Sequence, residues 1–169
     1  MAGTTGRWRP MRQGDLSLVS AIAARVHPDF PEDDAVFAER LALYPAGCFM
    51  LEVGGRPAGY ILSHPWRFGH LPALNALLRH LPDAPSTYYI HDVALLPEAR
   101  GSGAASAIVA ILVVHAADRA LPNLSLVAVN GSQGFWHRHG FSVHADPALT
   151  DKLASYDADA RLMVRAIQA

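Results

Sequence analysis

The stretch VALLPEARGSGAA, residues 93–105, decides the fold of this 169-residue chain. Its apolar beginning continues Tyr88 and Ile90 and predicts a strand over 88–95. A turn with Pro97, Gly101 and Gly103 follows, and helical spacing of apolar residues then predicts a helix over 101–120. The first backbone N–H groups of a helix have no intrahelical acceptor and lie at the positive end of its dipole. The strand, turn and helix therefore predict a site for a phosphate group.

The residues of the turn reduce the number of phosphate ligands that would fit. Gly101 and Gly103 allow a close approach to the backbone, and Arg100 adds charge and hydrogen bonds. A dinucleotide-binding fingerprint would have a third glycine where Ser106 stands, and a P-loop would have Gly-Lys-Ser/Thr, which the chain lacks. A glycine-rich helix start that binds nothing is the remaining alternative from the residues alone.

Two segments in order resemble a known family. The first, Arg100 to Ala105, resembles the Arg/Gln-x-x-Gly-x-Gly/Ala signature of the GNAT superfamily of N-acetyltransferases. The second, the strand LVAVN over 126–130 followed by FWHRHGF over 135–141, is similar to the second CoA motif of that family. The resemblance implies an α+β fold over a single domain, 1–169. Its central mixed, mostly antiparallel sheet has six to seven strands, with helices on both faces.

The resemblance also implies acetyl-CoA as the co-substrate. The pyrophosphate would lie on the turn before the helix, and the pantetheine arm would hydrogen-bond along the preceding strand like an extra strand. The residues that this implies for cofactor binding are Val93, Ala94, Leu95, Arg100, Gly101, Ser102, Gly103, Ala104, Ala105, Asn130 and Trp136.

Amine acylation requires a base, because an alkyl amine with a pKa near ~10 must lose a proton before it attacks. His91 is the first candidate, since its ordinary pKa near ~6.5 suits the task and its place before Arg100 resembles that of a histidine in aralkylamine N-acetyltransferases. Asp92 is the rival base. Strand alternation predicts that Tyr89, His91 and Val93 share one face, and that Asp92 lies on the other face with residues 88 and 90.

The residue that acts as the general acid in the family has no counterpart at the matching position of this chain. Trp136 occupies the position where the family has its usual tyrosine, and an indole N–H is far too weak an acid to protonate a thiolate. Tyr88, Tyr89 and a residue of the segment 64–87 are the alternatives. A thiolate whose thiol has a pKa near ~8.5 also leaves readily without an acid.

The rest of the chain supplies a hairpin around Gly54-Gly55 and a long irregular segment. Strands are predicted over 7–11, 47–53, 57–63, 124–129, 141–144 and 162–166. Three helices are predicted as well: the first begins at residue 15, the second ends at about residue 44, and the third spans 132–139. The Pro- and His-rich segment 64–87, with a short helix predicted over 71–80, would wall the acceptor site, form a surface flap or make a homodimer contact. The acids Glu32, Asp33 and Asp34 are interpreted first as a solvated helix start, and second as an attraction for a cationic amine.

Charge and composition exclude several classes of partner. The net charge is −1 and no two Lys or Arg residues are adjacent, which argues against nucleic acid. The apolar stretch over 104–114 is too short for a bilayer, and residues 1–10 do not resemble a signal peptide, so a cytoplasmic protein without a membrane partner is expected. The nine histidines lack metal-site spacing, so no metal is expected, and the lone Cys48 is interpreted as a buried structural thiol.

These observations lead to one functional hypothesis and one alternative. The chain is expected to be an enzyme, an acyltransferase that moves an acetyl group from acetyl-CoA to a primary amine by direct attack in a ternary complex. The acceptor is expected to be a small molecule rather than a protein. The alternative is a CoA-binding sensor or regulatory module with little or no turnover.

Overall fold

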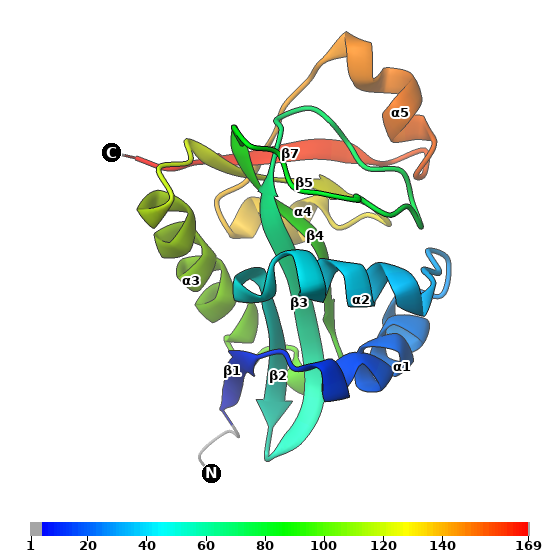
Figure 1. Cartoon of the computed structure of the whole chain (residues 1–169), viewed down its shortest axis with the longest axis vertical. Coiled ribbons are helices and arrows are strands. Elements are labelled where there is room, and N and C mark those ends of the chain that lie inside the picture. Colours follow the sequence, from blue (N-terminus) through cyan, green and yellow to red (C-terminus); the bar gives the residue numbers. More distant parts are fainter. Residues whose placement is uncertain (1–4, 169) are drawn as a thin grey trace.

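The computed structural model describes residues 5–168 as a seven-stranded mixed sheet with helices on both faces (Figure 1). The strand order is β1-β2-β3-β4-β5-β7-β6, and every neighbouring pair is antiparallel except β4 and β5. The predicted α+β fold with a mostly antiparallel sheet is confirmed. The strands are β1 (Gly6–Pro10), β2 (Cys48–Val53), β3 (Arg56–Trp66), β4 (Thr87–Leu95), β5 (Asn123–Ala128), β6 (Ser142–Val143) and β7 (Arg161–Ala166).

Alternation along β3 divides the core between the two faces of the sheet. Tyr60 and Leu62 pack with Val19 and Phe37 under α1 (Leu16–Val26) and α2 (Asp34–Leu43); α2 crosses over β3 in Figure 1, and α1 contacts β3 and β4. Ile61 points the other way and packs against the long helix α3 (Ala104–Asp118) and the short helix α4 (Gln133–Arg138). A further short helix, α5 (Thr150–Ala154), precedes β7 and was not predicted.

The segment between β3 and β4 does not contain the predicted helix over 71–80, so that prediction was wrong. Asn75 and Arg79 have left-handed backbone conformations, with φ of +56° and +73°, which a continuous helix does not allow. Side chains elsewhere in the fold bind the backbone of the segment: the carboxylate of Glu39 accepts hydrogen bonds from the N–H groups of Leu78 and Arg79. Tertiary contacts therefore hold this segment in an irregular conformation instead of a helix.

Two general properties follow from the described part of the chain. The Cys48 thiol is buried between α2 and the sheet, and burial raises its pKa to about 12, so the thiol stays protonated. No helix within residues 5–168 is both long and apolar enough to cross a membrane.

Candidate functional site

The main cavity of the protein lies where β4 and β5 separate. The two strands pair only at Tyr88–Leu124 and Tyr89–Ser125, and beyond these pairs no ladder joins them. The gap is a cavity of about 730 Å³, a volume typical of cofactor and ligand sites. Its walls come from β4, from β5 and the residues after it, from the start of α3 and from α4.

The glycine turn forms one end of this cavity. Gly101 and Gly103 have φ of +76° and +81°, and a methyl group added to either would meet no atom within 4 Å, so both face open space. The first hydrogen bond of α3 runs from the Ala107 N–H to the Gly103 carbonyl, which leaves the N–H groups of Ala105 and Ser106 without an acceptor inside the helix. The Trp8 indole of β1 donates to the Ala104 carbonyl at 2.8 Å and fixes the start of the helix.

The structure places nine of the eleven predicted cofactor residues along this cavity and two outside it. The Ala94 side chain packs under α1 and α2, and the Ser102 hydroxyl donates to the Ala99 carbonyl at 2.5 Å. Only their backbones remain available to a ligand there. The residues that line the cavity are Val93, Leu95, Arg100, Gly101, Gly103, Ala104, Ala105, Asn130 and Trp136.

The second motif closes the far wall of the cavity. Asn130 has a left-handed backbone, with φ of +55°, and its N–H donates to the Asp157 carboxylate at 2.8 Å. Trp136 is buried and packs edge-on against Phe135 and Phe141, with ring centroids 4.9 and 5.3 Å apart. Trp136 therefore contributes an apolar surface to the cavity and no ionisable group.

A β-bulge at His91 sets the direction of the side chains on β4. Leu62 of β3 pairs with Asp92 and the next residue, Ser63, pairs with Ile90, so that His91 is the extra residue. The bulge reverses the alternation: Asp92 turns toward α1 and α2, whereas Val93 packs on the α3 side. The prediction that Asp92 shares a face with residues 88 and 90, and Val93 with Tyr89, was wrong because the bulge has no signature in the apolar pattern.

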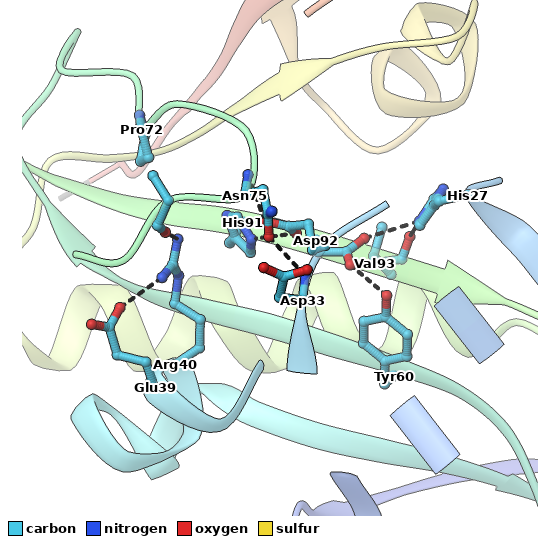
Figure 2. Close-up of polar contacts among 12 residues, drawn as sticks. His27, Asp33, Glu39, Arg40, Tyr60, Pro72, Asn75, His91, Asp92 and Val93 are labelled. Atoms are coloured by element: carbon cyan, nitrogen blue, oxygen red, sulfur yellow. Dashed lines mark hydrogen bonds and ion pairs between the residues drawn. The ribbon is translucent and has the colours of Figure 1, made fainter. Parts of the chain in front are cut away.

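Asp92 sits at the centre of a partly buried polar network (Figure 2). One carboxylate oxygen lies 2.9 Å from Nε2 of His27, the residue that ends α1, and the other accepts a hydrogen bond from the Tyr60 hydroxyl. The same Nε2 lies 3.0 Å from the Val93 carbonyl. Both oxygens of Asp92 are thus engaged.

The charges of Asp92 and His27 stabilise each other. Burial alone would lower the pKa of His27, but the hydrogen bond and the negative charge of Asp92 raise it above its ordinary value. Burial likewise would raise the pKa of Asp92, and the bond and charge of His27 hold that pKa below its ordinary value. The pair is therefore favoured in its charged form.

His91 makes a second histidine–carboxylate pair. Its Nε2 lies 2.9 Å from the Glu32 carboxylate, and both side chains are only 8% exposed. Glu32 is therefore not part of a solvated helix start, as first interpreted. Asp33 and Asp34, by contrast, lie in exposed contacts, with Asn75 and Ser20 respectively.

A smaller pocket of about 80 Å³ opens beside the main cavity. The two share five lining residues, among them His27, His91 and Asp92, so the two histidine pairs stand at their junction. The small pocket is otherwise lined by Glu32, by aromatic residues and by residues 72–74 of the β3–β4 segment. Of the alternatives for the segment 64–87, the structure places part of it as a wall of this pocket.

Sequence reasoning missed His27, Tyr60 and Tyr156 as residues of the site. They come from the end of α1, from β3 and from the segment after α5, and none belongs to a recognisable motif. Tyr88 lies outside both cavities, where its hydroxyl pairs with Ser63 on the α3 side. No cluster of three or more metal-ligating side chains occurs within residues 5–168.

Comparisons with known proteins agree with this geometry. The model of the acetyltransferase (GNAT) family matches residues 16–141. A search of curated protein sequences finds no match.

Solved structures match nearly the whole chain. The loading GNATL domain of CurA from Lyngbya majuscula has a TM-score of 0.77 at 15% identity, covering 96% of this chain and 98% of that one. The GNAT-like decarboxylase GphF, in complex with isobutyryl-CoA, has a TM-score of 0.76 at 16% identity, covering 96% and 100%. Ard1 from Thermoplasma volcanium has a TM-score of 0.71 at 17% identity, covering 98% and 99%. At these identities the likeness shows a shared fold.

Proposed function

The chain belongs to the acetyltransferase (GNAT) family, and on this premise we propose that it transfers an acetyl group from acetyl-CoA to a primary amine. The observation that carries the proposal is the glycine turn at the start of α3, which faces a cavity that continues between β4 and β5. This arrangement supports a ligand with a pyrophosphate at one end and a long, thin arm at the other. CoA has that shape, and the GphF relative binds an acyl-CoA.

The cofactor would be held by the backbone more than by side chains. The pyrophosphate would accept hydrogen bonds from the N–H groups of Ala105 and Ser106 at the positive end of the α3 dipole, with the exposed Arg100 as a counter-charge. The pantetheine arm would follow β4 from Val93 to Leu95, in the place of the β5 strand that has turned away. The thioester would then lie at the bulge, next to the small pocket.

The reaction is a direct attack in a ternary complex. The amine lone pair forms the C–N bond to the thioester carbonyl carbon, the C–S bond breaks, and the sulfur leaves as a thiolate. Backbone N–H groups at the bulge are suited to stabilise the oxyanion that forms on the way. His91, at the junction of the two cavities and held by Glu32, is the base that takes the proton from the amine.

Asp92 is better suited to position His27 than to act as the base. Its two oxygens are engaged by Tyr60 and His27, and its lowered pKa makes it a weak proton acceptor. His27 lines the cofactor cavity, Asp92 raises its pKa, and we assign it as the proton donor to the leaving thiolate. This role is the one that the family's tyrosine has and that Trp136 cannot take.

The proposal is tested by CoA release from acetyl-CoA with a panel of amines, together with calorimetry of acetyl-CoA binding. Turnover with at least one primary amine of the panel is the expected result. Tight acetyl-CoA binding without turnover on any amine would instead favour the sensor alternative, which the absence of the usual tyrosine keeps open.

A further inference from the structure

The β3–β4 segment forms a roof over the small pocket because it is tied to both sides of the site. On one side, the hydroxyl of Tyr156, after α5, donates to the Pro72 carbonyl. On the other side, the Asn75 side chain accepts from the Asp33 N–H at 2.7 Å, and the Asn75 N–H donates to Glu32 at 3.3 Å (Figure 2). The roof therefore joins the loop before α2 to the segment before β7 and crosses the path that an extended chain would take over the small pocket.

The pocket under the roof is narrow and mostly apolar. Phe30, Leu74, Tyr89 and Tyr156 are among its apolar and aromatic lining residues. Its volume of about 80 Å³ is well below the roughly 150 Å³ of a cavity that holds benzene. A short alkyl chain fits this space and an aromatic ring does not.

The charges at the pocket select against an acid on the acceptor. Glu32, Asp92 and His27 all line it, the positive charge of His27 offsets that of Asp92, and none of its lining residues is Lys or Arg. The guanidinium of Arg40, under the same segment, is already bonded to Glu39 and to the Ala76 carbonyl (Figure 2). A cationic amine is attracted by Glu32, whereas a carboxylate next to the amine would be repelled by it.

We propose that the roof restricts the acceptor to a small primary amine with a short alkyl body and no acidic group, and that it excludes amino acids and polypeptides. The alkyl body lies under Leu74 and Tyr156, and the nitrogen lies at the junction beside His91. This inference rests on the proposed acyl transfer and specifies its acceptor.

The test compares kcat/KM for four acceptors. Isobutylamine and valine differ by the carboxylate alone, 2-phenylethylamine tests size, and a hexapeptide with a free N-terminus tests access. Isobutylamine is expected to exceed each of the others by at least about 100-fold. Leu74→Ala, which removes part of the roof, is expected to raise the ratio of 2-phenylethylamine to isobutylamine at least about tenfold. Leu77→Ala is the control, since Leu77 is similarly exposed (39% against 41%) in the same segment but does not line the pocket.

The outcomes separate this inference from the proposed function. Valine or the hexapeptide acetylated as well as isobutylamine would overturn the acceptor assignment, as would an unchanged ratio in Leu74→Ala. If no amine is acetylated, saturation-transfer NMR with CoA present determines whether the amines bind in the pocket. If isobutylamine binds and Leu74→Ala changes its affinity, the assignment of the pocket to the amine stands and only the acyl transfer is refuted. If no amine binds, the assignment of the pocket is refuted as well.

Discussion

Replacing Gly103 with Glu tests the cofactor site most directly, and the chain offers a matched control in Gly55. Both glycines are exposed and left-handed, with φ of +81° and +75°, and an added Cβ would meet no atom within 4 Å at either. Each substitution therefore costs about the same backbone strain, roughly 1–2 kcal/mol. Gly55 lies in the turn between β2 and β3, whereas Gly103 lines the main cavity.

The two variants should differ in cofactor affinity alone. A Glu carboxylate about 4 Å from a phosphate oxygen, at an effective dielectric constant of about 20, is unfavourable by roughly 4 kcal/mol. Since each 1.4 kcal/mol is about a factor of ten, acetyl-CoA affinity should fall by about 100- to 1000-fold in Gly103→Glu, with the lower value allowing for movement of the flexible side chain. Gly55→Glu should bind acetyl-CoA as the parent does.

Isothermal calorimetry with acetyl-CoA measures the affinities, and urea unfolding of both variants measures the shared strain. Equal acetyl-CoA affinities in Gly103→Glu and Gly55→Glu would refute the placement of the pyrophosphate at the start of α3. Equal losses of stability with unequal affinities are the result that the reasoning requires.

Three further predictions concern histidines. His91→Ala should lower kcat by at least about 100-fold and leave the acetyl-CoA Kd unchanged; a kcat near that of the parent would remove His91 as the base. Asp92→Asn removes the charge that raises the pKa of His27, so the alkaline limb of the kcat–pH profile should move to lower pH, and an unmoved limb would contradict the acid role of His27. Burial lowers the pKa of His64 to about 3, so the unfolded chain binds its proton first as the pH falls below about 6.5. When the pH is lowered from 7.5 to 5, His64 should reduce the free energy of unfolding by about 2 kcal/mol. Urea titrations of His64→Asn should lack this part of the decrease.

The strand–turn–helix could be predicted from the residues because it depends on local backbone rules, whereas the second motif was identified by its resemblance to the family. Left-handed glycines at 101 and 103, a free helix start and apolar helical spacing are properties of consecutive residues. The same is true of the turn at Gly54-Gly55, where both residues have positive φ and the predicted hairpin is confirmed. The strand–turn–helix motif and the hairpin were therefore correct to within a few residues.

The acceptor side could not be predicted in the same way because contacts between distant segments determine it. A short helix was predicted over 71–80, but Asn75 and Leu78 instead bond to the α1–α2 loop and to the Glu39 side chain of α2. Glu32 looks solvated in the sequence and becomes buried only when His91 lies opposite it. Tyr156 is 84 residues from Pro72, its hydrogen-bond partner. Each of these positions follows from the assembled fold and from no local pattern.

The bulge at His91 links the two halves of the site. Without the extra residue, regular alternation would place Asp92 on the α3 side with Ile90, in an apolar core where a carboxylate has no partner. With it, Asp92 turns to Tyr60 and His27, and His91 turns to Glu32, so one inserted residue brings both histidine–carboxylate pairs to the junction of the two cavities. Because Trp136 cannot donate a proton there, the proton transfers that we propose for this chain depend on that junction. The bulge is therefore a requirement of the proposed chemistry as much as a feature of the sheet.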